Sequence, residues 1–149
     1  MPGMALKTIV HDSLEYRDTV ALRSAVLRQP LGLSFSADEL SAEATSHHLG
    51  CFVDDRLVGC LVLTPIDATE IQMRQLAVDE GARGRGVGRM IVKYAEDLAR
   101  ELGFRRMVLH ARETAVPFYE LLRYTRVGDR FTEVTIPHWE MVKRLEGVK

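Results

Sequence analysis

The sequence predicts a mixed α/β (α+β) fold, and two patterns indicate it. An apolar, β-prone run at residues 71–78 passes through a glycine-rich turn into an amphipathic helical segment, and a second apolar run follows at residues 106–111. A strand, a helix and another strand within about forty residues form a parallel, right-handed βαβ unit. Upstream, residues 48–53 and 56–63 are separated only by Asp54 and Asp55, which predicts an antiparallel hairpin.

The first part of the chain predicts one strand and two helices. Residues 6–10 form the strand, and a helix over residues 14–27 follows, with Asp12 or Ser13 as its N-cap. Pro30 prevents this helix from continuing. The pattern Ser36-Ala-Asp-Glu39 resembles a capping box that opens a short second helix. The predicted apolar side of the first helix consists of Val20, Leu22, Val26 and Leu27.

The last part of the chain predicts one helix and two strands. Residues 114–122 are helical, with Pro117 tolerated in the first turn. Residues 124–134 and 139–145 form the strands, separated by Ile136-Pro137. The 149 residues, with 46% hydrophobic content, suit a single domain over residues 1–149.

Composition excludes several classes of partner. There are 20 basic and 21 acidic side chains, a net charge of −1, so no global field favours nucleic acid or an anionic membrane. The sequence has no apolar run long enough for a membrane span and no signal-peptide pattern, so we expect a cytoplasmic protein. Cys51 and Cys60 lack metal-ligand spacing and suit buried positions. We expect no metal, because no histidine, cysteine and carboxylate cluster has ligand spacing.

Residues 83–88 read Arg-Gly-Arg-Gly-Val-Gly and predict an anion site. Apolar residues recur at helical spacing from Val87 onwards, so a helix starts close to Gly86 and its first amides lack partners within the helix. Because glycine has no Cβ, phosphates can approach the backbone and meet these amides at the positive end of the helix dipole. The glycines of this site are Gly84, Gly86 and Gly88, and its arginines are Arg83, Arg85 and Arg89.

The spacing excludes two common phosphate-binding motifs. A dinucleotide fingerprint needs glycine at its sixth position, and counting from Gly84 places Arg89 there. A Walker loop needs lysine directly after its last glycine, and neither Gly86 nor Gly88 is followed by lysine. A glycine-rich turn without a ligand is the alternative that stays open.

The pattern Arg83-x-x-Gly86-x-Gly88, preceded by Leu76-Ala77-Val78, resembles the acyl-CoA pyrophosphate loop of the GCN5-related N-acetyltransferase (GNAT) superfamily. The predicted order of strands and helices is also similar to the GNAT fold over nearly the whole chain. The resemblance implies a mixed, mostly antiparallel sheet with a central βαβ unit, helices on both faces, and acetyl-CoA (coenzyme A) as cofactor. The implied cofactor-binding residues are Leu76, Ala77, Val78, Arg83, Gly84, Arg85, Gly86, Val87, Gly88, Arg89, Arg112, Phe118 and Tyr119.

Two catalytic groups follow from this resemblance. The segment Thr114-Ala-Val-Pro-Phe-Tyr119-Glu is similar to the family segment in which a Phe-Tyr pair packs near the cofactor thiol. The resemblance makes Tyr119 the general acid, because a nearby phenol can protonate the departing thiolate. The alternative is a core aromatic beside Phe118. The family's oxyanion donor, a backbone N–H at a bulge of the strand before the loop, matches Leu76.

The general base is where the sequence departs from the family. An alkylammonium acceptor has a pKa near ~10 and must lose a proton before it attacks. Where relatives often place a glutamate or histidine on this strand, the chain has Gln72 and Arg74, and neither accepts a proton at neutral pH. Glu70 shares their face of the strand. It can act through a water chain or be a solvated residue at the strand start.

His138 and Glu133 are the next candidates for the base. The segment 131–141 looks like the end of some bacterial GNAT enzymes, where a histidine sits between the last two strands near the acceptor cleft. A histidine with its pKa near ~6.5 suits base catalysis at physiological pH. An exposed turn histidine is the alternative. His110, in or just after the predicted strand 106–111, can reach the cleft or pack against the helices.

Arg112 and Arg123 are two further departures from the family, which often has asparagine and glycine at these places. Without that glycine, either Arg123 accepts a strained left-handed conformation or the helix ends differently. Both arginines are candidates for binding CoA phosphates instead.

The expected function is acetyl-CoA-dependent N-acetyl transfer to a primary amine by direct attack in a ternary complex. No cysteine lies in these motifs, so an acetylated enzyme has no obvious nucleophile. Two alternatives stay open: a non-catalytic acyl-CoA-binding sensor or regulatory domain, and a nucleotide or other phosphate-ligand module. Residues 29–35, the second helix and residues 134–138 are expected to frame the pocket for a small-molecule or peptide amine. A homodimer is possible in this family.

Overall fold

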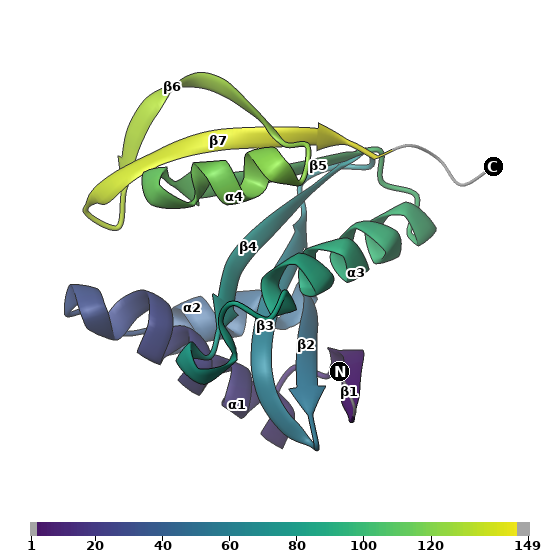
Figure 1. Cartoon of the computed structure of the whole chain (residues 1–149), viewed down its shortest axis with the longest axis vertical. Coiled ribbons are helices and arrows are strands. Elements are labelled where there is room, and N and C mark those ends of the chain that lie inside the picture. Colours follow the sequence, from purple (N-terminus) through teal and green to yellow (C-terminus); the bar gives the residue numbers. More distant parts are fainter. Residues whose placement is uncertain (1–2, 146–149) are drawn as a thin grey trace. The chain divides into compact units, whose positions relative to one another are not determined.

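The computed structural model describes residues 3–145 and has the predicted order of strands and helices (Figure 1). In those residues, no helix is long and apolar enough to cross a membrane. The strands are β1 (Met4–Ile9), β2 (His47–Val53), β3 (Arg56–Pro65), β4 (Glu70–Val78), β5 (Arg106–Arg112), β6 (Thr125–Glu133) and β7 (Ile136–Arg144). The α-helices are α1 (Leu14–Arg23), α2 (Ala37–Ala42), α3 (Val87–Glu101) and α4 (Val116–Leu121).

The strands form a mixed, mostly antiparallel sheet, as predicted. Their hydrogen-bonded order is β1-β2-β3-β4-β5-β7-β6. β4 and β5 pair in parallel and are joined through α3, which confirms the βαβ unit. The β1/β2, β2/β3, β5/β7 and β6/β7 pairs are antiparallel.

The chain divides into two compact units, and β4 contributes to both. Of the described residues, unit 1 comprises 3–64 and 75–95, and unit 2 comprises 65–74 and 96–145. Residues predicted to bind the cofactor or to act in catalysis therefore fall in both units.

In unit 1, consecutive residues of β3 show that helices cover both faces of the sheet. Gly59 lies against Val87 and Ile91 of α3, and a Cβ at this position would come 2.5 Å from Ile91 Cδ1. The next residue, Cys60, directs its Sγ toward the Thr19 carbonyl of α1, 3.9 Å away. Because successive strand side chains point to opposite faces, α3 and α1 lie on opposite sides of β3 (Figure 1).

The first two helices begin at the predicted caps. The Ser13 side chain accepts a hydrogen bond from the Tyr16 N–H at the start of α1. Ser36 and Glu39 form the complete capping box of α2. These contacts confirm the predicted starts, because each side chain satisfies an amide that has no partner within its helix.

The predicted end of the first helix is wrong. The regular α-helix ends at Arg23, and helical turns then continue as a π-turn (Ser24–Arg28) and a 3-10 turn (Gln29–Leu31). Pro30 lies inside the 3-10 turn rather than stopping the helix. Proline is tolerated in the first turn of a helix, where its missing N–H has no helical acceptor.

In unit 2, the predicted boundary between the last two strands is also wrong. Ile136 and Pro137 belong to β7, and the turn consists of Val134 and Thr135, whose φ angles are 44° and 69°. Pro137 is the second residue of β7 and precedes the β5/β7 pairing, which begins at His138, so β6 is its only strand neighbour and the missing donor is tolerated. Neither turn residue favours a positive φ, so the sequence lacks the residue types that predict a two-residue turn.

Arg123 follows α4 in the left-handed conformation, with φ 76°. Its N–H donates to the Glu120 carbonyl at 3.0 Å, and the Tyr124 N–H donates to the Tyr119 carbonyl at 3.0 Å. These bonds satisfy the end of the helix, so the first of the two predicted alternatives, strain at Arg123, is the one observed.

Replacing Arg123 with glycine is expected to raise the free energy of unfolding by about 0.5–1 kcal/mol, because glycine adopts a positive φ without the Cβ clash. Urea denaturation measures the effect. Arg123→Ala is the matched control, since it removes the same side chain but keeps Cβ. An equal gain in both variants would show that the side chain, not the backbone strain, is responsible.

Candidate functional site

The glycine-rich loop of unit 1 has the geometry of an anion site. Gly84 and Gly86 both have φ 78°, which opens the backbone just before α3. The first helical hydrogen bond runs from the Met90 N–H to the Gly86 carbonyl at 3.0 Å. The amides of residues 87–89 therefore stand at the open, positive end of the helix, as predicted.

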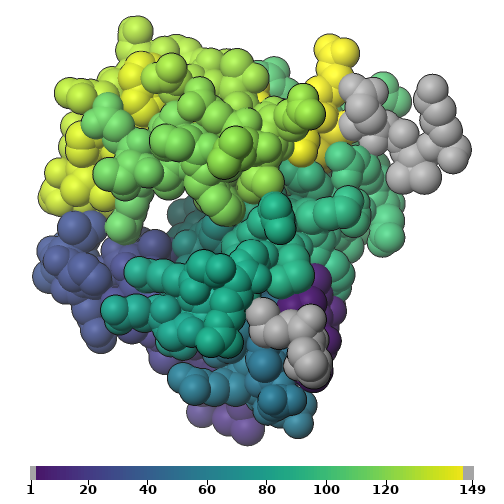
Figure 2. All heavy atoms as spheres, in the orientation of Figure 1, coloured from purple at the N-terminus to yellow at the C-terminus, as the bar shows by residue number. Residues whose placement is uncertain are grey.

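Arginines surround this loop. Arg83, Arg85 and Arg89 are all exposed, and the teal atoms of this segment lie at the surface in Figure 2. The Arg83 Nε donates to the Val78 carbonyl at 3.3 Å, which places one guanidinium beside the end of β4. The loop thus combines backbone donors with mobile positive charge, the two features that bind phosphate groups.

β4 contains a sharp backbone irregularity near its C-terminal end. Gln75 has φ 56°, an unusual value for a non-glycine residue inside a strand. The parallel pairing with β5 covers Glu70 to Met73 and ends before this point. Leu76, half-buried, and Ala77, buried, follow it. The irregularity stands where the family resemblance places the bulge that carries the oxyanion donor.

Tyr119 lies in α4 of unit 2 and is buried, with 8% of its surface exposed. Its ring makes edge-to-face contacts with Phe118 and Tyr124, at centroid distances of 5.0 and 5.9 Å. Burial raises the pKa of Tyr119 to about 12. The phenol therefore keeps its proton at neutral pH and is able to donate it.

Three predicted base candidates come together in unit 2. His110 Nδ1 lies 3.0 Å from one carboxylate oxygen of Glu133, and His138 Nε2 lies 3.7 Å from the other. His138 is not an exposed turn residue: it belongs to β7 and is 3% exposed. Its Nδ1 lies 2.9 Å from the Ile136 carbonyl, which can only accept, so Nδ1 carries the proton and Nε2 holds the lone pair of the neutral ring.

Glu70 and Arg112 lie at opposite ends of the strands of unit 2. Glu70 is the first residue of β4, and its carboxylate forms an ion pair with Arg106 at 3.2 Å. Glu70 and Arg106 line an open groove of about 1330 Å³, together with Arg100, Arg105 and Arg144. Arg112 is the last residue of β5 and lies opposite His138 of β7 in the sheet.

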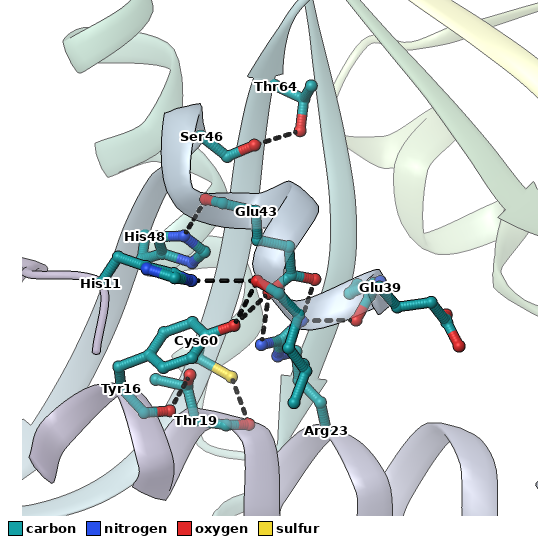
Figure 3. A network of polar contacts seen from close by, with 12 residues as sticks. His11, Tyr16, Thr19, Arg23, Glu39, Glu43, Ser46, His48, Cys60 and Thr64 are labelled. Atoms are coloured by element: carbon teal, nitrogen blue, oxygen red, sulfur yellow. Dashed lines mark hydrogen bonds and ion pairs between the residues drawn. The ribbon is translucent and has the colours of Figure 1, made fainter. Parts of the chain in front are cut away.

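The sequence reasoning missed a buried polar network in unit 1, drawn in Figure 3. The fully buried residues of α1 are Tyr16, Thr19 and Arg23, whereas the predicted apolar residues of this helix are only half-buried. Arg23 is 0% exposed and forms a two-point ion pair with Glu43 at 2.8 and 2.9 Å. The spacing of the three α1 residues, which is that of one helix face, is the signal that could have identified them.

The pKa values in this network follow from burial and pairing. Burial alone would raise the pKa of Glu43, but the hydrogen bonds from Arg23 and Tyr16 outweigh it and lower that pKa. Burial and the bond to Glu43 raise the pKa of Tyr16 to about 12. Burial lowers the pKa of His48, so its ring favours the neutral form. Glu43 is thus held as an anion and Arg23 as a cation.

The chain is similar to known proteins along most of its length. The model of the acetyltransferase (GNAT) family matches residues 14–123. The uncharacterised N-acetyltransferase YitI of Bacillus subtilis (strain 168) is 25% identical over 125 residues, which cover 80% of this chain and 84% of YitI.

Two solved structures share the fold. A crystal structure described as an N-acetyltransferase from Lactobacillus plantarum has a TM-score of 0.85 at 25% identity, and the match covers 97% of this chain and 99% of that one. An aminoglycoside 6′-N-acetyltransferase complexed with coenzyme A has a TM-score of 0.79 at 19% identity, over 97% of this chain and 99% of that one. The second likeness shows the fold alone.

Proposed function

Because the chain belongs to the acetyltransferase (GNAT) family, we propose that it moves the acetyl group of acetyl-CoA to a primary amine by direct attack in a ternary complex. The observation that carries this proposal is the loop before α3, where two glycines with positive φ precede the open amides of the helix. Acetyl-CoA supplies an acetyl group activated as a thioester. The residues of this chain bind it, orient it and move protons.

The loop fits the pyrophosphate of the cosubstrate. No heavy atom lies within 4 Å of the place where a Cβ would stand at Gly84, so the backbone is open to a ligand there. The amides of Val87, Gly88 and Arg89 would donate to phosphate oxygens, and the neighbouring arginines would neutralise their charge. The backbone of residues 76–78 would hold the pantetheine arm, as the family resemblance implies.

Leu76 and Tyr119 would perform two complementary tasks. The Leu76 N–H would donate to the acetyl oxygen as negative charge develops on it during attack. The Tyr119 hydroxyl would donate its proton to the departing sulfur. Phe118, in edge-to-face contact with Tyr119, would keep the phenol ring in place.

We assign the base to His138. Its ring is oriented by the Ile136 carbonyl, which leaves Nε2 as the acceptor for a proton from the incoming ammonium group. Glu133 would stabilise the imidazolium that forms, since its carboxylate lies 3.7 Å away. Glu70 is the second candidate, and its ion pair with Arg106 makes it the weaker one.

The acceptor is proposed to be a small-molecule or peptide amine. In unit 1, residues 29–35 would contribute to its binding, and they contain no acidic side chain, which weighs against a polyamine.

Amine-dependent release of thiol from acetyl-CoA tests the proposed function. A panel of primary amines between about pH 7 and pH 9 is suitable, because deprotonation of the amine increases over this range. Thiol release with any amine supports the proposed N-acetyltransferase activity. Stabilisation by CoA without release would instead favour an acyl-CoA sensor, which the absence of a carboxylate at Gln72 and Arg74 would suit. Stabilisation by ATP rather than acetyl-CoA would favour a nucleotide module.

Gly86→Ala is expected to raise the KM for acetyl-CoA about tenfold and to reduce the rise in melting temperature that CoA produces. A Cβ at φ 78° strains the loop and displaces its amides. Thermal denaturation with and without CoA measures the effect. Gly103→Ala is the matched control. Gly103 also has a positive φ, 92°, and no atom lies within 4 Å of a Cβ added there, but the residue follows α3. A KM change of equal size in the control would contradict the assignment.

A further inference from the structure

Gln75 has a backbone conformation that its own sequence does not favour. Its φ is 56°, and a non-glycine residue in this region persists only where the surrounding structure holds it. The positive φ values of Asp54 and Asp55 are explained by the two-residue turn between β2 and β3. Gln75 lies within β4 and in no turn, so its conformation needs another cause.

Arg23 makes the contact that can hold Gln75. The Arg23 Nη1 donates to the Gln75 side-chain oxygen at 2.8 Å. The same guanidinium binds both oxygens of Glu43, through Nη1 at 2.8 Å and Nη2 at 2.9 Å. A two-point ion pair fixes the plane of the guanidinium, so the N–H directed at Gln75 is fixed as well.

Glu43 is itself held by other elements of unit 1 (Figure 3). The Tyr16 hydroxyl donates to its carboxylate at 2.7 Å, and His48 Nε2 lies 2.9 Å from its backbone carbonyl. The Arg23 guanidinium also lies over the Phe35 ring at 5.1 Å. The ion pair is therefore anchored by α1, the turn after α2 and β2, and Gln75 conforms to it.

We infer that Arg23 and Glu43 are positioning residues that hold Gln75 in its left-handed conformation and so fix the direction of the Leu76 N–H. This inference rests on the proposed function, in which that N–H binds the acetyl oxygen. The peptide between Gln75 and Leu76 is planar, so the dihedral angles of Gln75 orient the N–H. Misplacement of a catalytic group by about 1 Å costs about 10²-fold in rate, so such a support affects kcat.

Two substitutions at Gln75 separate this role from a merely structural one. Gln75→Leu and Gln75→Gly both remove the bond with Arg23, but only glycine keeps a positive φ without strain. We expect kcat to fall about tenfold to thirtyfold in Gln75→Leu and to stay within about threefold of wild type in Gln75→Gly. The KM for acetyl-CoA and the CoA-induced rise in melting temperature are expected to stay unchanged in both, since the loop amides are untouched.

The melting temperature gives a readout that does not depend on turnover. Gln75→Leu is expected to lower it by about 2–4 °C, and Gln75→Gly by less. Asp55→Ala serves as the control for strain, because it places alanine at a positive φ in a distant turn of the same unit. It is expected to lower the melting temperature without changing kcat.

The outcomes distinguish failure of this inference from failure of the proposed function. A wild-type kcat in Gln75→Leu, or a Gln75→Gly variant as impaired and as unstable as Gln75→Leu, overturns the positioning role and leaves the proposed function intact. A wild-type protein that binds CoA but releases no thiol with any amine overturns both.

Discussion

Tyr119→Phe is expected to lower kcat about a hundredfold or more while the KM for acetyl-CoA changes little. General acids contribute about 10²–10⁴-fold to rate, and the substitution removes only the proton donor. The phenylalanine ring keeps the contacts with Phe118 and Tyr124, so the pocket is retained. Steady-state thiol release at a saturating amine concentration measures both constants.

The acceptor amine and Tyr119 together determine the expected pH profile of the wild-type protein. The rate is expected to rise between about pH 7 and pH 9 as the acceptor amine loses its proton. Because burial raises the pKa of Tyr119 to about 12, the phenol stays protonated throughout this range and causes no decline. A rate that falls between these pH values would contradict the role of Tyr119 as an acid with a raised pKa.

Tyr124→Phe is the matched control for this prediction. The Tyr124 hydroxyl donates to Glu96 at 2.7 Å, and Lys143 binds the same carboxylate at 3.0 Å. Its loss is expected to cost about 1 kcal/mol of stability and to leave kcat unchanged. An equal loss of kcat in both variants, or full activity in Tyr119→Phe, would remove Tyr119 from the mechanism.

Glu43→Leu is expected to lower the free energy of unfolding by about 3–5 kcal/mol, because it leaves the Arg23 charge buried without its counter-ion. Arg23 is 0% exposed and cannot recover hydration in the folded state. Urea denaturation at neutral pH measures the loss. The double variant Arg23→Met/Glu43→Leu is expected to recover most of it, since two apolar side chains of similar volume can replace a buried ion pair.

The control for this prediction is an ion pair of the same unit in which the carboxylate is exposed. Glu39 pairs with Arg28 at 3.2 Å, and its side chain is 44% exposed. Glu39→Gln keeps the capping box of α2, where glutamine also serves, and is expected to cost less than about 1 kcal/mol. A loss in Glu43→Leu as small as this would show that the buried pair contributes little.

The buried pair of Arg23 and Glu43 makes stability depend on pH in the acid range. The pKa of Glu43 is lower in the folded protein than in the unfolded chain, so the unfolded chain binds more protons as the pH falls. The stabilisation is therefore fully present above the unfolded pKa of about 4.3, and it is lost as the pH falls through the folded pKa. In Glu43→Leu this part of the pH dependence is expected to disappear.

Local patterns predicted most of the fold. The caps at Ser13 and Ser36, the hairpin at Asp54-Asp55 and the start of α3 after Gly86 are set by neighbouring residues, and the structure has all of them. The loop geometry could likewise be predicted, because glycines before an amphipathic helix mark it directly.

The sequence does not predict features that depend on contacts between residues distant in the chain. Arg23 resembles a solvent-exposed residue in the sequence, and only its partner Glu43, distant in the chain, makes its burial favourable. Glutamine does not favour a positive φ, so only the family resemblance predicts the irregularity of β4 at Gln75. The resemblance places His138 between the last two strands, whereas β7 begins at Ile136 and includes it.

Initial velocities of thiol release, with acetyl-CoA and a reactive amine both varied, test the central claim most directly. Direct attack in a ternary complex predicts intersecting double-reciprocal lines and no acetylated protein when the amine is omitted. Parallel lines with an acetylated protein would contradict direct attack, because they indicate a covalent intermediate. No amine-dependent release, in a protein that CoA still stabilises, would contradict the enzyme itself.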